Sequence, residues 1–337
     1  MRFLLKFGLF LALIMVITSI SLLVRDDISF PREPGPVLDN KVRGNYMEAI
    51  DEHHPQIVLL GDSTLGASLD AAKLAEGTDR SVYSISIPGS ASALWYLILK
   101  NNIAEASYQP DYLVVVFRDT ILTAPGYRVQ GSYFELLDEY ADHNEPLLMQ
   151  NSFVGLMNPL EIMAEKYLPL YVARADLRKK IDTRVRYFTP ALFGCHKNCT
   201  DLALGEIFAG ADLEPGALVD AVGAAESYLY TADQLDFDTQ LGRSYLPEMV
   251  RIANENNIKL VFVRVKVNTH AADPKLDAYI SSLSEYLQNN QAFLLDYGQD
   301  ARLTRDLFLD SIHLNPAGQI VFTQMVADGL NELFAKE

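Results

Sequence analysis

A continuous apolar run, Tyr112–Phe117 (YLVVVF), most constrains how this chain can fold. It is rich in β-branched residues and shows no alternation of polar and apolar positions. A strand that is apolar on both faces is typical of a parallel sheet covered by helices on both sides. Comparable strand patterns occur at Gln56–Leu60, Ser81–Ile87, Ile258–Val267 and Ala292–Tyr297. The sequence therefore predicts a five-stranded sheet with helices on each face.

Helical patterns alternate with these strands. Helices are expected over residues 42–52, 91–105, 245–256 and 316–336. This alternation predicts a doubly wound α/β fold. Residues from about 124 to 239 are more than a crossover needs, and much of this stretch, 159–182 especially, reads as helical. We expect a mainly helical insertion that serves as a lid or a substrate-binding subdomain.

The amino-terminal segment contains an 18-residue apolar run, Phe7–Val24, preceded by Arg2 and Lys6. Its length is close to the roughly 20 residues that span a bilayer, and the positive-inside rule places the N-terminus in the cytoplasm. We expect an anchor over residues 1–25, a proline-rich linker over 26–40, and an extracytoplasmic domain over 41–337, in the periplasm or at the cell surface. A cleaved signal peptide is the alternative.

Charge and cysteine content narrow the function. The formal net charge is −16, which disfavours nucleic acid as a partner because phosphate attraction dominates such binding. The pair Cys195 and Cys199 is compatible with a short-loop disulfide in an exported domain. Free thiols are the next alternative, and a metal site is the last because no second ligand pair follows.

Chemically useful side chains follow several of the expected strands. Ser63 stands in Gly61-Asp62-Ser63 after the first strand, and Asp310 and His313 precede the last helix. A serine becomes a nucleophile when a histidine takes its proton and a carboxylate orients that histidine. The backbone N–H groups of Ser63 and Gly89 are candidate donors to an oxyanion. No cofactor and no metal are needed for this chemistry.

In four stretches the chain resembles the SGNH (GDSL-type) hydrolase superfamily of serine esterases and acyltransferases. The matching stretches are IVLLGDS (57–63), SIPGS (86–90), PDYLVVVF (110–117) and DSIHLNPAG (310–318). The resemblance covers roughly residues 55–120 and 250–335. It implies the flavodoxin-like form of the doubly wound sheet. It also implies that Ser63 is the nucleophile, that Gly89 is an oxyanion donor, and that Asp310 and His313 complete the triad.

The third of these stretches departs from the family pattern. The family usually has G-x-N-D there, and its asparagine completes the oxyanion hole. Here the chain reads Phe117-Arg118-Asp119-Thr120, with Asp119 at the position of the asparagine. An ionised carboxylate would repel an oxyanion. Either Arg118 supplies positive charge, or backbone donors act alone, or activity is reduced or lost.

The combination of a membrane anchor with such a domain resembles accessory proteins of bacterial envelope O-acylation. The resemblance implies transfer or removal of acetyl or similar acyl groups on an envelope glycan, beside a multi-spanning membrane O-acyltransferase. Two alternatives stay open. One is an inactive SGNH scaffold that binds polysaccharide or a membrane partner, and the other is an α/β domain with coincidental motifs.

Several further residues have two interpretations. Trp95 and Tyr96 fit the core better than a sugar platform, while Arg264 and Lys266 are either functional or edge charges. Substrate contacts are also conceivable for Tyr127, Arg128, Tyr133 and His270.

Overall fold

The computed structural model describes residues 30–39, 45–174, 226–268 and 273–336, with isolated positions between residues 6 and 20. Three sequence predictions lie outside this range. They are the Cys195–Cys199 disulfide, a role for His270, and most of the expected anchor. Within the part that is described, no helix is both long and apolar enough to cross a membrane.

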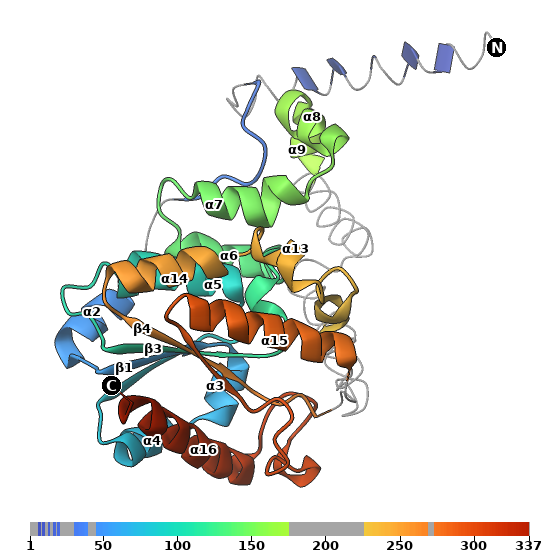
Figure 1. The fold of residues 1–337 in the computed structure, drawn as a ribbon. Helices are drawn as coiled ribbons and strands as arrows, with labels where there is room; N and C mark the ends of the chain where they lie inside the picture. The colour runs from blue at the N-terminus through green and yellow to red at the C-terminus, as the bar shows by residue number, and fades with distance from the viewer. Residues whose placement is uncertain are drawn as a thin grey trace, which may run out of the picture. The chain divides into compact units, whose positions relative to one another are not determined.

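A parallel five-stranded sheet forms the centre of the fold (Figure 1). Its strands are β1 (Ile57–Gly61), β2 (Val82–Ser86), β3 (Tyr112–Phe117), β4 (Lys259–Arg264) and β5 (Phe293–Asp296). They are arranged in the order β2-β1-β3-β4-β5, and all neighbouring pairs are parallel. The prediction of a doubly wound parallel sheet is confirmed, and this order is the flavodoxin-like one.

The central strands are apolar throughout because both faces are covered. On β3, Leu113 and Val115 belong to one hydrophobic cluster, whereas Val114 and Val116 belong to the other. Successive side chains of a strand point to opposite faces, so each cluster receives every second residue. This two-sided burial explains why the sequence shows a continuous run instead of alternation.

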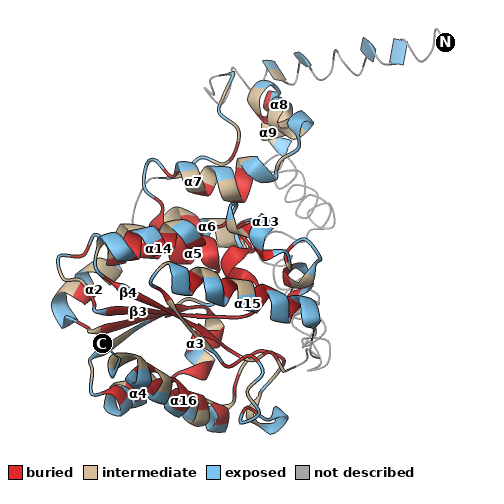
Figure 2. Ribbon diagram, in the orientation of Figure 1, coloured by how far each residue is buried: buried red, intermediate tan, exposed pale blue. Residues whose placement is uncertain are grey.

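Helices cover the two faces separately. In Figure 1, α4 (Ala71–Thr78) and α16 (Pro316–Phe334) lie on one face, while α5 (Ser92–Ile98), α14 (Leu246–Glu255) and α15 (Pro274–Asn289) lie on the other. Figure 2 shows that the buried residues of these helices face the sheet. The described part of the chain also contains the helices α2 (Asn45–His53), α3 (Ser63–Ser68), α6 (Ser132–Tyr140), α7 (Pro146–Leu148) and α13 (Phe237–Leu241). Its π-helices are η1 (Leu99–Ile103) and η3 (Met149–Phe153), and its 3₁₀ turns are η2 (Ile121–Thr123), η4 (Val154–Leu156), η5 (Ser227–Tyr230) and η6 (Arg305–Leu307).

Some boundaries differ from the sequence prediction. The helix expected over 91–105 is divided into α5 and the π-helix η1. The strand expected over 258–267 ends at Arg264, and the side chain of Lys266 donates to the carbonyls of Asp300 and Leu303. Helix α15 was not predicted, although a crossover between parallel strands requires such an element.

The chain divides into two compact units. Residues 37–155 and 218–337 form the sheet unit, and residues 1–36 and 156–217 form the α8–α9 unit. The described part of the latter contains α8 (Pro159–Tyr167) and α9 (Pro169–Val172). Helix α8 starts with a capping box, in which the Asn158 side chain accepts from backbone N–H groups and Glu161 accepts from the Asn158 N–H. The helical content expected for 159–182 is thus present in its described part.

Candidate active site

The serine singled out in the sequence lies on the tight turn from β1 into α3. Asp62 caps α3, because its Oδ1 accepts a hydrogen bond from the N–H of Thr64 at 2.8 Å. Gly61 has no room for a side chain, since a Cβ there would lie 2.8 Å from the Cβ of Leu65 and 3.0 Å from the carbonyl oxygen of Val116. The packing of α3 against the ends of β1 and β3 therefore fixes the position of Ser63.

Asp310 and His313 occupy a small loop just before α16. An antiparallel bridge between Phe308 and Leu314 closes this loop. Within it, the Oδ1 atom of Asp310 accepts from the N–H groups of Ile312 and His313, both at 2.8 Å. Because the Asp310 carboxylate organises the backbone of its own turn, its second oxygen is held toward the imidazole.

The structure brings Ser63, His313 and Asp310 into one hydrogen-bonded chain. His313 Nε2 lies 2.9 Å from Ser63 Oγ, and His313 Nδ1 lies 2.7 Å from Asp310 Oδ2. Burial raises the pKa of Asp310, but hydrogen bonds from His313 and from two backbone N–H groups outweigh it and hold the pKa below its ordinary value. The carboxylate therefore stays ionised, and the Nδ1-protonated tautomer leaves Nε2 available to accept the serine proton.

Gly89 lies after β2, at the same edge of the sheet as Ser63. Its φ is +80°, which a residue with a side chain rarely adopts, and a Cβ there would lie 2.7 Å from Cε1 of Tyr133. The loop is further held by Ser90, whose hydroxyl donates to the carbonyl of Gly61 and accepts from Trp95 Nε1. Among the described residues, the backbone N–H groups of Ser63 and Gly89 have no recorded acceptor.

Arg118 lies beneath this turn in a buried ion-pair network. Its guanidinium donates to Asp62 Oδ2 and to Glu226 Oε2, each at 3.0 Å, and only 1% of its side chain is exposed. Burial lowers the pKa of Arg118, but the two carboxylates more than offset this and hold the pKa above its ordinary value. Arg128 completes the network, because its Nη2 lies 3.0 Å from Glu226 Oε1 and its Nη1 lies 3.7 Å from Asp62 Oδ2.

Asp119 is paired in a second network, beside β4. Its Oδ1 accepts from Nε and Nη2 of Arg264 at 2.9 and 2.6 Å, and its Oδ2 accepts from the hydroxyl of Tyr230 at 2.5 Å. Arg264 also lies 3.3 Å from Asp296 at the end of β5. A buried guanidinium thus compensates the charge of Asp119, which answers the expectation that an uncompensated carboxylate would repel an oxyanion.

The sequence did not identify every member of these networks. Glu226 contacts Arg118 across 108 residues of sequence, and Tyr230 contacts Asp119 across 111. Neither belongs to a motif, and both lie near the carboxyl end of the stretch from about 124 to 239 that was predicted to be an insertion. The available signal was indirect: charged residues at the ends of apolar strands, such as Arg118 and Arg264, require partners when they are buried.

The other sequence candidates have ordinary positions. Trp95 and Tyr96 are buried in the core, as expected. Arg128 and Tyr133 lie next to each other, with the guanidinium 5.7 Å from the ring centroid, and Tyr127 donates to Glu226. Within the described residues no group of three or more His, Cys, Asp or Glu side chains could hold a metal ion.

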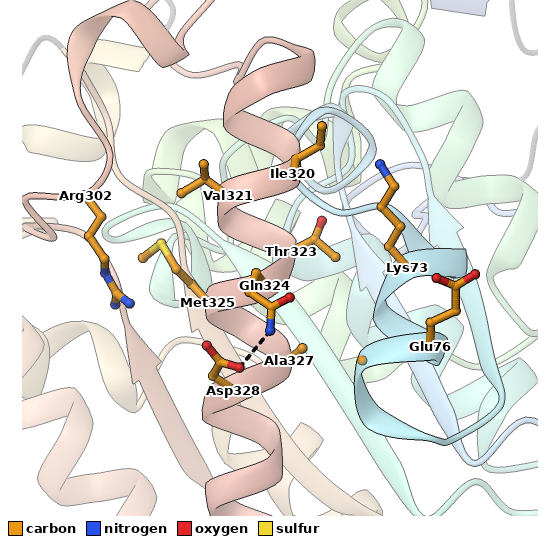
Figure 3. Close-up of a pocket in the computed structure, with 11 residues that line it drawn as sticks. Lys73, Glu76, Arg302, Ile320, Val321, Thr323, Gln324, Met325, Ala327 and Asp328 are labelled. Atoms are coloured by element: carbon orange, nitrogen blue, oxygen red, sulfur yellow. Dashed lines mark hydrogen bonds between the residues drawn. The ribbon is translucent and has the colours of Figure 1, made fainter.

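A groove of about 730 Å³ lies elsewhere in the sheet unit, between α4 and α16 (Figure 3). None of Ser63, Asp310 and His313 lines it. Several of its polar side chains have partners nearby: Lys73 pairs with Asp70, Arg302 pairs with Asp300, and Gln324 donates to Asp328. This groove is therefore separate from the hydrogen-bonded chain at the carboxyl edge of the sheet.

Comparison with known proteins gives similarity at the level of structure. No protein-family model matches the chain, and no curated protein matches it. A candidate acylhydrolase from Bacteroides fragilis is 11% identical over 82% of this chain and 86% of its own, with a TM-score of 0.39. A GDSL-like lipase from Bacteroides thetaiotaomicron is 10% identical over 86% of this chain and 98% of its own, with a TM-score of 0.38.

A third similar structure is a gut microbial diltiazem-metabolizing enzyme. It is 10% identical, with a TM-score of 0.37, and the match covers 89% of this chain and 49% of that one. These identities and TM-scores are low, so the chemistry proposed below is derived from the chain's own side chains.

Proposed function

We propose that the chain is a serine esterase or O-acyltransferase in which Ser63, His313 and Asp310 act as the catalytic triad. The observation that carries this proposal is the hydrogen-bonded chain from Ser63 Oγ through the imidazole to Asp310 Oδ2, with links of 2.9 and 2.7 Å. Nucleophile, base and orienting carboxylate within hydrogen-bond reach are the geometric signature of nucleophilic acyl transfer.

In this mechanism the Ser63 oxygen attacks the carbonyl carbon of an ester. His313 Nε2 takes the serine proton, and Asp310 stabilises the imidazolium. The N–H groups of Ser63 and Gly89 donate to the oxyanion without help from an asparagine side chain. Collapse of the tetrahedral intermediate breaks the ester bond, and His313 returns the proton to the departing alkoxide. The acyl-enzyme then passes its acyl group to water or to a hydroxyl of an acceptor.

The proposed substrate is an acyl ester, such as an acetyl ester, of an extracytoplasmic envelope glycan. The support for this part is the layout of the sequence, in which an apolar run at Phe7–Val24 precedes a proline-rich linker and the α/β domain. We propose that this run is a membrane anchor with a cytoplasmic N-terminus, and that a multi-spanning membrane acyltransferase is the partner. No cofactor takes part.

The test is hydrolysis of p-nitrophenyl acetate by the full-length chain. We expect turnover in the wild type and a fall of about 10³-fold or more in both Ser63→Ala and His313→Ala. Ser132→Ala and His143→Ala are the matched controls, because both residues are exposed and lie outside the triad. A fluorophosphonate should label the wild type and the controls, but not Ser63→Ala.

One observation favours a second candidate, a catalytically inactive scaffold that binds glycan or a membrane partner. After β3 the chain has Asp119 where the resembled family has an asparagine donor. The side chains of Arg118 and Asp119 are both engaged in ion pairs, so neither replaces that donor. A folded wild type that neither turns over the ester nor reacts with the fluorophosphonate would select this candidate and would refute the triad mechanism.

A further inference from the structure

Exposed apolar side chains are concentrated in one of the two units. Among the large exposed hydrophobic residues of the described chain, those of the sheet unit are Val37, Tyr228, Leu309 and Ile320, which are scattered in sequence. All the others belong to the α8–α9 unit. A cluster of exposed apolar side chains marks a contact surface, whereas single ones are normal on any protein.

Helix α8 presents one such surface. Leu160, Met163 and Tyr167 follow one another at helical spacing and are 77%, 59% and 55% exposed. Leu156 and Leu168 extend the surface at the two ends of the helix, and we name these five residues the α8 apolar face. Figure 2 marks exposed residues on α8.

The same helix buries a carboxylate. The side chain of Glu165 is only 10% exposed, and it accepts a hydrogen bond from Arg174 at 3.0 Å. A helix on a water-facing surface normally shows the opposite arrangement, with charged residues outside and leucine inside. The inverted arrangement indicates that the outer side of α8 meets an apolar medium.

We propose that the α8 apolar face lies on the surface of a lipid bilayer. The proposal rests on the membrane anchor suggested above, to which α8 is physically linked. The backbone N–H of Arg32 donates to the carbonyl of Lys166 at 3.2 Å, within the same compact unit. Seven residues lie between Val24 and Arg32. The eight residue steps from one to the other span at most about 29 Å, so α8 stays close to the point where the apolar run would leave the membrane.

The residues beside the face favour a bilayer over a protein partner. The ammonium of Lys166 lies 5.9 Å from the ring centroid of Tyr167, and the guanidinium of Arg174 lies 3.6 Å from that of Tyr171. Tyrosine beside lysine or arginine is typical of the boundary between lipid and water, where aromatic rings and long basic side chains bridge the two media.

Charge is also compatible with a membrane surface. The helical segment has two acidic and two basic side chains (Glu161, Glu165, Lys166 and Arg174), although the chain as a whole has a formal net charge of −16. A local balance of charge avoids the repulsion that an acidic protein would meet at anionic lipids.

The test places a fluorescent reporter on the face. Trp95 is the one tryptophan of the chain and is fully buried in the core, so an added tryptophan can be followed against a constant background. We would reconstitute full-length Met163→Trp into phosphatidylcholine–phosphatidylglycerol vesicles with or without brominated acyl chains. Ser284→Trp, at an exposed position of α15, is the matched control.

We expect brominated lipid to reduce the added fluorescence of Met163→Trp by at least about twofold and to leave that of Ser284→Trp unchanged. A second substitution, Leu160→Asp in the Met163→Trp background, should abolish the quenching. Folding is not at risk in this variant, since substitutions of exposed side chains usually change stability little.

Flotation with the vesicles separates failure of the anchor from failure of the face. A chain that floats but shows no quenching at position 163 overturns the lipid contact and leaves the anchor standing. A chain that does not float overturns both. A blue shift at position 163 that depends on protein concentration and not on lipid would identify a protein partner and would likewise overturn the proposal.

Discussion

The sheet unit buries charged side chains, whereas the α8–α9 unit exposes apolar ones. At the carboxyl edge of the sheet, the side chains of Arg118 and Asp119 are 1% and 2% exposed, and each has a partner of opposite charge. On α8, Leu160 is 77% exposed. Each arrangement is costly in water, the first through desolvation and the second through hydration of apolar surface.

This difference suggests that the two units have different roles. Buried ion pairs beside a nucleophile hold a fixed geometry, and strongly perturbed charged groups gather at functional sites. Exposed apolar side chains do not stabilise an isolated unit, but they become buried when a second surface covers them. We therefore assign chemistry to the sheet unit and contact to the α8–α9 unit.

The largest expected effect concerns chemistry in the sheet unit. Asp310→Asn should lower kcat for p-nitrophenyl acetate by about 10⁴-fold, because a carboxamide no longer holds His313 in the tautomer that accepts the serine proton. KM should change little, since Asp310 does not contact substrate in the proposed mechanism. Steady-state kinetics measure both constants. Asp306→Asn is the control, and a loss of similar size there would contradict the assignment.

The next effect compares a buried arginine with an exposed one. Arg118→Ala removes the fully buried guanidinium from Asp62 and Glu226 and leaves them the partly exposed Arg128. It should lower the free energy of unfolding by about 3–5 kcal/mol. Arg174→Ala removes a guanidinium that is 52% exposed and should cost less than about 1 kcal/mol. Urea unfolding measures both variants. Equal losses would refute the distinction between the two units.

A third substitution examines the position where the resembled family has asparagine. Asp119→Asn should lower the free energy of unfolding by about 1.5–3 kcal/mol, because hydrogen bonds to the charged Arg264 are weakened. It should bring no gain in rate, because this side chain contacts Arg264 and Tyr230. Urea unfolding and ester hydrolysis measure the two effects. A rate above that of the wild type would show that Asp119 reaches the oxyanion.

The local sequence pattern was sufficient to predict the strands and the positions of the candidate site residues at their ends. The bounds of β3 were predicted without error, because a strand buried on both faces leaves a continuous apolar run. The residues Ser63, Asp310 and His313 were identified because each stands beside a strand end or helix start. Their mutual distances then depended on the order of the strands, which the alternation of helices and strands does not determine by itself.

The ion-pair partners could not be predicted in this way. Glu226 and Tyr230 are selected by three-dimensional proximity to Arg118 and Asp119, and no short-range periodicity records such a pairing. The exposed face of α8 was missed for a related reason. Leu160, Met163 and Tyr167 have the spacing of an ordinary core-facing helix, and the structure alone shows that this side faces outward.

A smaller effect is the pH dependence of stability that Asp310 contributes. The folded-state pKa of Asp310 is lower than its ordinary value of about 3.9, so the unfolded chain binds this proton more readily. The resulting stabilisation is fully present above about pH 4 and is lost as the pH falls through the folded-state pKa. Urea unfolding at pH 6 and pH 3 should show that wild type loses more stability than Asp310→Asn. Equal losses would mean that Asp310 makes no such contribution.

The smallest expected effect tests the contrast between the units most directly. Leu160→Ala should change the free energy of unfolding by no more than about 0.5 kcal/mol, because the Leu160 side chain is mostly exposed in the folded chain. Leu60→Ala is the matched control, since Leu60 is fully buried in β1 and its loss should cost about 2–5 kcal/mol. Urea unfolding in the absence of lipid compares the two variants. A cost above about 2 kcal/mol for Leu160→Ala would show that another part of the chain covers α8, and the surface would then no longer be available to a bilayer.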